Sequence, residues 1–251
     1  MRIVRCQTKT GSRYGILEGE SVALLSAGPF GDYRRDEEIP LAAVHLLAPC
    51  EPTKIVAVGI NYRPHAAEIA FEIPAEPLLF LKPPSAVIGP EEAIILPAMS
   101  RQVEYEGELA AVIGRPAKDV PEEESLRYVL GYTCFNDVTA RDLQKKDVQF
   151  TRAKSFDTFA PFGPWIETEL DPDRVTIETK VNGELRQRAA SSEMLRSTAM
   201  LVSFASRVMT LLPGDVLATG TPAGVGPLQA GDTVTVTIDQ IGTLTNKVAH
   251  S

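Results

Sequence analysis

Polar and apolar positions alternate over residues 103–108 and then give way to an apolar run over residues 109–113. Alternation at period two is typical of a half-buried strand, and the run predicts that the same strand enters a core. Glu104, Glu106 and Glu108 then point to one face. Three carboxylates on one face repel one another, so the pattern indicates either a solvated edge strand or a bound cation. Glu108 lies directly against the apolar run, where an unpaired carboxylate is costly, and this favours a cation such as Mg²⁺.

Short strand patterns separated by turn residues fill the first fifty residues. Residues 1–7, 13–17 and 21–25 predict strands, with Gly11 and Gly19 in the turns between them. Residues 28–40 hold glycines, prolines and a charged cluster and predict a loop, and residues 41–47 predict a short helix. The prolines around residue 50 mark a boundary. We therefore expect a small N-terminal accessory domain over residues 1–50 and a larger domain over residues 51–251.

The larger domain is also rich in strand patterns. Strands are predicted over residues 55–59, 78–82, 93–97, 128–135, 175–181 and 216–219, and a closing hairpin over residues 232–238 and 242–248. Asn182-Gly183 is a strong hairpin-turn signal. Residues 197–209 predict an amphipathic helix with Ser197 as its N-cap. The chain as a whole is therefore predicted to be mainly β with some α.

A histidine and a glutamate lie three residues apart after the strand over residues 55–59. Pro64 fits a first helical turn, so His65 and Glu68 share one helical face. A carboxylate beside an imidazole orients the ring and raises its basicity, which suits a general base that activates water. The alternative is an ordinary surface ion pair. Residues 69–77 carry prolines and acids and are candidates for a lid.

Further candidate groups follow in the second half of the larger domain. Asp137 is either a helix cap or a third carboxylate ligand brought in on a neighbouring strand, and spacing does not decide between these. Lys154 is either a solvated lysine or a group that binds a substrate carboxylate or enolate oxygen near a metal. Residues 220–227 form a glycine-rich loop without the P-loop signature; its N–H groups either hold an anionic substrate group or serve only as a turn.

Composition narrows the class of function. The net charge of −8 argues against a nucleic-acid partner, because no basic surface is available to offset phosphate repulsion. Cys6, Cys50 and Cys134 are too few and too far apart for a disulfide framework or a thiolate zinc site. No leader pattern and no apolar run long enough for a membrane span are present, so we expect no membrane partner and a reducing cytoplasm.

Taken together, these segments resemble the fumarylacetoacetate hydrolase family over about residues 52–248. The resemblance is carried by the following motifs, in order: Gly59 to Glu68, Phe80-Leu81-Lys82-Pro83, Tyr105-Glu106-Gly107-Glu108-Leu109, Gly131-Tyr132, Asn136-Asp137-Val138-Thr139-Ala140-Arg141-Asp142, Ala153-Lys154-Ser155-Phe156-Asp157, Val181-Asn182-Gly183-Glu184 and Thr219-Gly220-Thr221-Pro222-Ala223-Gly224-Val225-Gly226. The first fifty residues match poorly, which fits a variable accessory domain.

The resemblance implies a mixed β-sandwich roll, a homodimer and a Mg²⁺ or Mn²⁺ site. The metal carboxylates of the family fall on Glu106, Glu108 and Asp137, which leaves Glu104 outside the ligand set. The active-site lysine falls on Lys154, with Lys82 a weaker candidate of the same kind. In acylpyruvase-like members a His–Glu pair on a lid helix activates water, and these positions match His65 and Glu68. Positions near the substrate match Arg141, Gln144 and Thr221.

The activity implied by the resemblance is hydrolytic C–C cleavage of an acylpyruvate, a 2,4-dioxo acid, through a metal-bound enolate. A 2-oxo acid would chelate the metal while His65 draws a proton from water. Isomerisation of 2-hydroxyhepta-2,4-diene-1,7-dioate and decarboxylation or tautomerisation of oxaloacetate pass through the same kind of enolate and stay as alternatives. A different class, a non-catalytic cation-binding β module, would need the three carboxylates but not His65 or Lys154.

Overall fold

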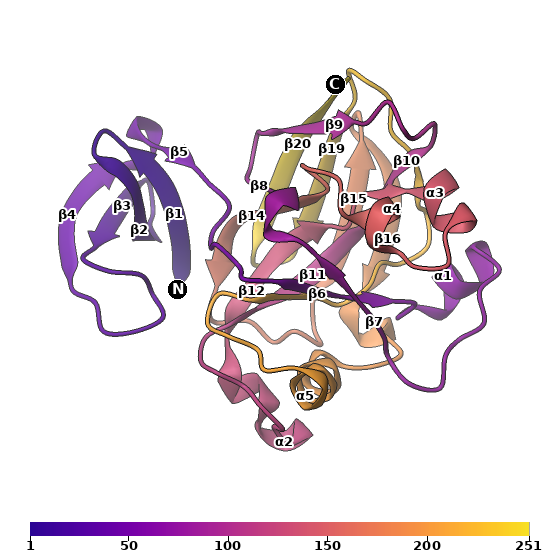
Figure 1. The fold of residues 1–251 in the computed structure, drawn as a ribbon. Coiled ribbons are helices and arrows are strands. Elements are labelled where there is room, and N and C mark those ends of the chain that lie inside the picture. Colours follow the sequence, from indigo (N-terminus) through magenta and orange to yellow (C-terminus); the bar gives the residue numbers. More distant parts are fainter. Residues whose placement is uncertain (251) are drawn as a thin grey trace.

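The computed structural model describes residues 1–250. The N-terminal part is a small antiparallel sheet (Figure 1). Its elements are β1 (Arg2–Thr8), β2 (Gly11–Glu18), β3 (Ser21–Leu25), β4 (Arg35–Pro40), the 3₁₀-helix η1 (Leu41–Ala43) and β5 (His45–Leu46). Two predictions for this part are wrong. Part of the predicted loop forms β4, because it pairs with β3. Only three residues of the predicted helix are helical, as η1, and the chain then pairs with β1 as β5.

The N-terminal sheet continues into the largest sheet of the molecule. The strand order is β4-β3-β2-β1-β14-β12-β11-β17-β6-β7, and β1 meets β14 with Arg2 opposite Glu167 and Ile3 opposite Ile166. The strands added after the N-terminal part are β6 (Ile55–Gly59), β7 (Leu78–Lys82), β8 (Val87–Ile88), β11 (Gly107–Ile113), β12 (Val129–Asn136), β14 (Ala160–Glu167) and β17 (Val216–Ala218). Because β11 and β12 lie in the interior of the sheet, they are buried along their whole or nearly their whole length.

A second sheet packs against the first and completes a β-sandwich roll (Figure 1). Its order is β16-β15-β19-β20-β9, and a short sheet of order β13-β10-β18 lies beside it. The bounds are β9 (Ala93–Leu96), β10 (Val103–Tyr105), β13 (Thr139–Ala140), β15 (Thr176–Val181), β16 (Glu184–Ala190), β18 (Gly226–Pro227), β19 (Thr233–Ile238) and β20 (Gly242–His250). The inner residues of β15 and β19 alternate with solvent-facing ones and pack against β11 and β12. The prediction of a mainly β chain with a β-rich N-terminal part is therefore confirmed.

The helices are short and lie outside the sheets. They are α1 (Arg63–Glu68), α2 (Glu122–Ser125), α3 (Arg141–Lys146), α4 (Thr151–Lys154) and α5 (Thr198–Val208), with 3₁₀-helices η2 (Pro84–Ala86), η3 (Leu126–Tyr128) and η4 (Ser191–Glu193). α5 begins as predicted at Ser197, whose hydroxyl accepts a hydrogen bond from the Met200 N–H at 3.2 Å. Its buried side packs against β6, β11 and β17. No helix within residues 1–250 has the length and apolarity needed to cross a bilayer.

The predicted strand over residues 103–113 is divided at Glu106. The first three residues form β10, which pairs with β13 and β18, and the remainder forms β11 in the large sheet. The chain changes from one sheet to the other at this point. Glu104, Glu106 and Glu108 are all buried, with exposed fractions of 6%, 4% and 1%, so the solvated-edge interpretation is wrong.

Candidate metal centre and active site

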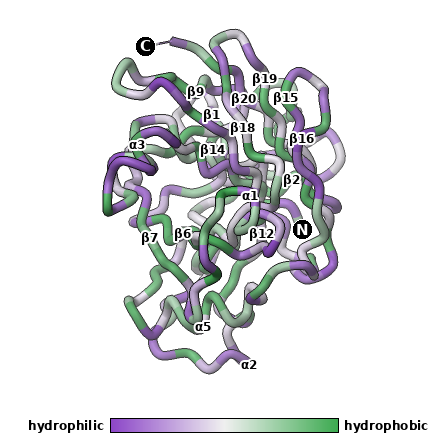
Figure 2. Tube along the Cα trace, turned by 90° about the vertical axis from the view of Figure 1, so that its right-hand side faces the viewer, coloured by the Kyte–Doolittle hydropathy of each residue, from purple (hydrophilic) through white to green (hydrophobic). Residues whose placement is uncertain are grey.

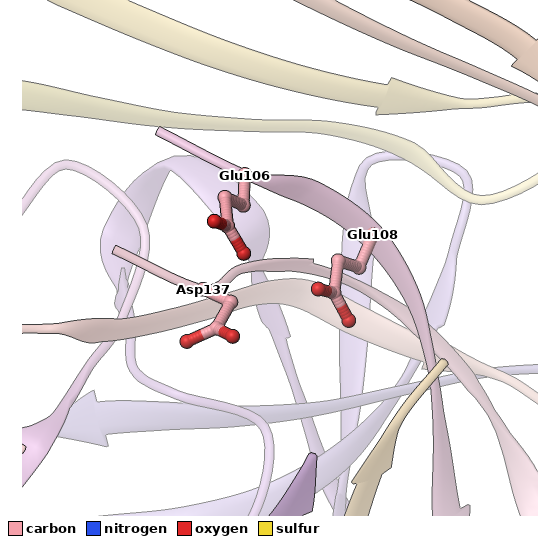
Figure 3. Close-up of side chains that lie close together, drawn as sticks. All are labelled: Glu106, Glu108 and Asp137. Atoms are coloured by element: carbon pink, nitrogen blue, oxygen red, sulfur yellow. The ribbon is translucent and has the colours of Figure 1, made fainter. Parts of the chain in front are cut away.

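Three carboxylates converge where β11 and β12 lie side by side. The register places Gly107 opposite Asn136, so Glu106 and Glu108 flank the end of β12, and Asp137 follows directly. The Asp137 N–H donates to the Glu106 carbonyl oxygen at 2.9 Å. One carboxylate oxygen from each of Glu106, Glu108 and Asp137 lies within 4.8 Å of the others (Figure 3). Asp137 is thus brought in on a neighbouring strand, as one of the two interpretations of its position required.

Two buried amide side chains fix the backbone between the carboxylates. The Asn136 Oδ1 accepts the Glu106 N–H, and the Gln187 Oε1 accepts the Gly107 N–H, both at 3.0 Å. Gln187 also donates to the Thr221 hydroxyl at 2.8 Å, and Thr221 donates to the Gly107 carbonyl at 2.9 Å. These bonds satisfy the backbone where it leaves the sheet ladder, and they hold both glutamates in place.

Gly107 has a steric role in this arrangement. A Cβ atom at this position would lie 2.0 Å from the Thr179 Oγ1 and 3.3 Å from the Gln187 Oε1. Only a glycine lets β11 approach β15 this closely. The spacing Glu-Gly-Glu therefore sets two carboxylates on one side and a close backbone contact on the other.

Buried cations pair with two of the three carboxylates. The Lys154 Nζ donates to the Glu106 Oε2 at 2.8 Å and to the Asp137 Oδ2 at 2.7 Å. The Lys82 Nζ donates to the Asp137 Oδ1 at 2.5 Å, and the Arg141 guanidinium bonds to both Glu106 and Glu104. Glu104 is thus the partner of Arg141, in agreement with its exclusion from the ligand set.

Glu108 is in a different electrostatic environment. Its Oε2 accepts the Gly220 N–H at 2.7 Å, and within residues 1–250 no Lys, Arg or His side chain lies within ion-pair distance of it. Burial, together with Asp137 and Glu106, raises the pKa of Glu108 well above its usual value. Burial also raises the pKa of Glu106, but Lys154 and Arg141 outweigh it, so this pKa lies well below its usual value.

The donor set fits a divalent cation. Glu104, Glu106, Glu108 and Asp137 supply four carboxylates against the three cations Lys82, Lys154 and Arg141, which leaves one negative charge at Glu108. Carboxylate oxygens are the ligands that Mg²⁺ and Mn²⁺ take. Glu106, Glu108 and Asp137 could therefore hold such an ion, and its charge would offset the repulsion that Glu108 experiences.

A cavity of about 520 Å³ opens beside the carboxylates. Seven of the nine predicted site residues line it: His65, Glu68, Glu106, Arg141, Gln144, Lys154 and Thr221. The other two do not line it: Asp137 is bonded to the lining Lys154, and Glu108 accepts the N–H of Gly220, the neighbour of the lining Thr221. Much of the remaining lining is apolar, including Ile60, Phe71, Phe80 and Phe150. This combination of an apolar wall and a few convergent charges is typical of a small-molecule site.

His65 and Glu68 form a pair at the rim of this cavity. The His65 ring is 4% exposed, and its Nδ1 lies 3.1 Å from the Glu68 Oε2. The Glu68 Oε1 accepts the Gly224 N–H at 2.9 Å. Because the carboxylate engages Nδ1, the Nε2 is the ring nitrogen left for a ligand. The imidazole is buried, whereas Glu68 is exposed and its side chain keeps 31% of its accessible surface.

Some of the groups with a part in this site have other roles than the sequence predicted. Two N–H groups of the glycine-rich loop donate to protein carboxylates, Gly220 to Glu108 and Gly224 to Glu68. Lys82, only a weak candidate in the sequence, is fully buried and bonded to Asp137. The sequence offered one sign of this role, which is a lysine within an otherwise apolar strand.

Gln187 was missed, because an exposed-looking glutamine in a hairpin strand gives no local sign of its contact with Gly107.

Comparison with known proteins agrees with this geometry. The model of the fumarylacetoacetate (FAA) hydrolase C-terminal domain matches residues 54–249. The chain belongs to the fumarylacetoacetate hydrolase family. A second model, Rv2993c-like N-terminal, matches residues 1–49. The resemblance noted in the sequence is thereby confirmed at family level.

Several similar members of the fumarylacetoacetate hydrolase family are enzymes by name. A crystal structure of 5-carboxymethyl-2-hydroxymuconate delta-isomerase from Mycobacterium smegmatis is 48% identical, covers 100% of both chains and superposes with a TM-score of 0.95. Oxaloacetate tautomerase YisK from Bacillus subtilis (strain 168) is 44% identical over 83% of this chain and 74% of its own length. Maleylpyruvate hydrolase from Sphingobium sp. SYK-6, in complex with manganese(II) and pyruvate, is 33% identical over 100% of both chains, with a TM-score of 0.83.

Proposed function

We propose that the protein is a divalent-metal-dependent enzyme that acts on 2-oxo and 2,4-dioxo acids, with hydrolytic C–C cleavage of an acylpyruvate as its reaction. The observation that carries this proposal is the buried His65 imidazole, held by Glu68 in the same cavity as Glu106 and Lys154. A pure binding module has no use for an oriented imidazole at that place. The maleylpyruvate hydrolase that binds manganese(II) and pyruvate supports the choice of metal and of a pyruvate-like product.

Charge balance indicates the substrate class. Glu106, Glu108 and Asp137 would hold a Mg²⁺ or Mn²⁺ ion, which would act as a Lewis acid toward the oxygens of a bound 2-oxo acid. With a divalent ion, the cluster would carry one net positive charge in place of one negative charge. A carboxylate at the end of the substrate would balance it. Arg141 and Gln144, which bond to each other at the cavity wall, are placed to orient that end.

The protein groups supply the proton chemistry. Glu68 would hold the His65 ring through Nδ1 and stabilise the imidazolium that forms when Nε2 takes a proton from water. The hydroxide attacks the distal carbonyl carbon of the 2,4-dioxo acid, and the bond between that carbon and the methylene carbon breaks. The methylene carbon leaves as the enolate of pyruvate, whose negative oxygen the Lys154 ammonium stabilises. Protonation of the enolate then gives pyruvate, and the attacked carbon leaves as a carboxylic acid.

A second candidate is isomerisation or tautomerisation, of 2-hydroxyhepta-2,4-diene-1,7-dioate or of oxaloacetate. The names of the similar isomerase and tautomerase support it. The same Lys154 would stabilise the enolate, and His65 would move a proton between carbon and oxygen without activating water. The two candidates differ in one product, because only hydrolysis forms pyruvate from an acylpyruvate.

The deciding experiment uses metal-stripped protein with and without Mg²⁺ or Mn²⁺ on acetylpyruvate, fumarylpyruvate, oxaloacetate and 2-hydroxyhepta-2,4-diene-1,7-dioate. Metal-dependent release of pyruvate from a dioxo acid is expected. His65→Gln should lower kcat by roughly 10²- to 10⁴-fold, the usual contribution of a general base, and retain Mn²⁺ binding. The exposed His45 offers a matched control, since His45→Gln should leave turnover unchanged. Loss of enol absorbance without pyruvate would instead assign the isomerase reaction.

A further inference from the structure

The segment that carries the His65–Glu68 pair is an excursion from the large sheet. It leaves β6 and returns at β7, which pair with Gly59 opposite Leu78. We refer to residues 60–77 as the lid segment. It contains α1, which faces the viewer in Figure 2, and its Ile60, Ile69 and Phe71 line the cavity together with His65. The position of the imidazole therefore depends on what holds this segment against the body of the protein.

The start of the lid segment is tied to the chain just before α5. The Asn61 Nδ2 donates to the Arg196 carbonyl at 3.0 Å and to the Thr219 carbonyl at 2.8 Å. In return, the Arg196 N–H donates to the Asn61 Oδ1 at 3.0 Å, and the Leu195 N–H donates to the Asn61 carbonyl at 2.8 Å. Ile60 next to this contact has a φ of 57°, a conformation that a β-branched residue adopts only when its surroundings fix it.

The far end of the lid segment is held by the side chain of the same residue. The Arg196 guanidinium donates through Nη2 to the Pro74 carbonyl. Its Nη1 is buried and has no hydrogen-bond partner among the described residues, and within residues 1–250 no carboxylate forms an ion pair with it. The polar contact of this guanidinium with the protein is thus the carbonyl of the lid segment. Arg196 holds the start of the segment through its backbone and the end through its side chain.

Between these two points, Glu68 is the remaining polar attachment that the structure gives to the helix. Its carboxylate joins the His65 Nδ1 to the Gly224 N–H. Asn61 is bound on both its backbone and its side chain, whereas Pro74 is bound through a single side-chain donor. The attachment at Pro74 is therefore the weaker of the two.

We propose that Arg196 is a positioning residue that clasps the lid segment at both ends and so holds His65 over the carboxylate cluster. The kinetic part of this inference rests on the proposed function. The structural part does not, because the order of the lid segment can be measured without turnover. Removing the guanidinium frees the Pro74 end, which allows α1 to move and displaces the imidazole from its working position.

Hydrogen exchange followed by mass spectrometry tests the structural part in the full-length protein. The Ile69 and Phe71 amides bond to the His65 and Ala66 carbonyls and report on α1. In Arg196→Met they should exchange about tenfold faster than in the parent protein, while the amides of β11 keep their rate. Arg196→Lys retains a charged donor and should restore most of the protection. Arg207→Met, at an exposed arginine on α5, is the matched control and should change neither region.

The kinetic readout separates positioning from general damage. Arg196→Met should lower kcat about tenfold because the base is misplaced, and it should leave Mn²⁺ affinity unchanged. Arg196→Lys should restore part of the lost turnover.

Unchanged hydrogen exchange of the lid amides in Arg196→Met would contradict the proposed role of Arg196, whatever the turnover. Because Arg196→Met could loosen the whole fold, Arg196→Gln serves as a milder second variant. Equal loosening of the lid and of β11 in both would also overturn it. If the parent protein turns over no 2-oxo acid, the proposed function fails. The hydrogen-exchange data still show whether Arg196 holds both ends of the lid segment.

Discussion

At the scale of single residues, Glu106 and Glu108 should respond in opposite ways to the same change. Glu106 is bonded by Lys154 and Arg141, so Glu106→Gln leaves each of these buried cations with one carboxylate in place of two and should cost about 1.5–3 kcal/mol. Among the described residues Glu108 is bonded only by the Gly220 N–H, which an amide oxygen can also accept, so Glu108→Gln should keep or raise the stability of the metal-free protein. Urea unfolding in EDTA measures both.

Glu106→Gln and Glu108→Gln should have the same effect on metal binding, because each removes a carboxylate from the cluster. Calorimetry with Mn²⁺ is expected to show weakened binding in both variants. A Glu108→Gln variant as unstable in EDTA as Glu106→Gln would contradict the assignment, since it would mean that a cation already compensates the Glu108 charge.

Gly107 provides a steric test at the same site. Gly107→Ala would place a methyl group 2.0 Å from the Thr179 Oγ1 and should destabilise the protein by about 1–3 kcal/mol, as overpacked substitutions do. Thr179→Ala alone should cost little, because this hydroxyl is buried without a partner among the described residues. The double variant removes the nearest clashing atom and should recover much of the lost stability in urea unfolding. Additive losses in the double variant would show that another contact sets the limit.

The residues of the site differ in how far the sequence alone could reveal them. Glu106 and Glu108 are visible because the period of a strand puts them on one side and the apolar run puts Glu108 beside a core. His65 and Glu68 are visible because helical spacing pairs them. Spacing leaves Asp137 undecided between a helix cap and a ligand, since strands that pair can be far apart in the chain, and only the family motif favoured the ligand. Arg196 lies beyond any local pattern, because its partners Asn61 and Pro74 are distant in sequence.

At the scale of elements, the predictions hold where a strand or helix carries its own pattern and fail where pairing decides. α5 and the hairpins β15–β16 and β19–β20 form as expected from their periodicity and turn residues. β4 was predicted as loop because its charged residues have no strand propensity, yet it pairs with β3. The break between β10 and β11 could not be predicted from the sequence pattern either. It arises because the Glu106 N–H donates to the Asn136 Oδ1 in place of a carbonyl of the sheet ladder.

At the scale of the whole molecule, the N-terminal sheet is joined to the rest of the fold by more than its connecting chain. β1 extends the large sheet at β14, and the Met1 ammonium donates to the Glu167 carboxylate at 2.8 Å. Ile3, Ala48 and Cys50 belong to the same apolar cluster as Ile55. Burial of this shared surface couples the two parts, so we expect them to unfold together.

The single tryptophan, Trp165 on β14, reports directly on this coupling. It packs against the apolar cluster of the N-terminal sheet and against the cluster between the two large sheets, and the Arg2 guanidinium lies 5.1 Å from its ring. Leu24→Ala, a change confined to the N-terminal cluster, should destabilise the protein by about 2–5 kcal/mol. With coupling, the urea midpoints from Trp165 fluorescence and far-ultraviolet circular dichroism coincide and shift together.

Leu185→Ala removes the same atoms from a leucine that is 51% exposed on β16, and it should shift neither midpoint by a comparable amount. If the N-terminal sheet folded independently, Leu24→Ala would instead split the circular dichroism transition, and the later phase would keep the parent midpoint. One coincident transition would mean that mutations in residues 1–49 act on the active site through global stability, without any contact with the substrate. The N-terminal part would then set how much loss of stability the buried charges of the candidate metal centre can impose on the fold.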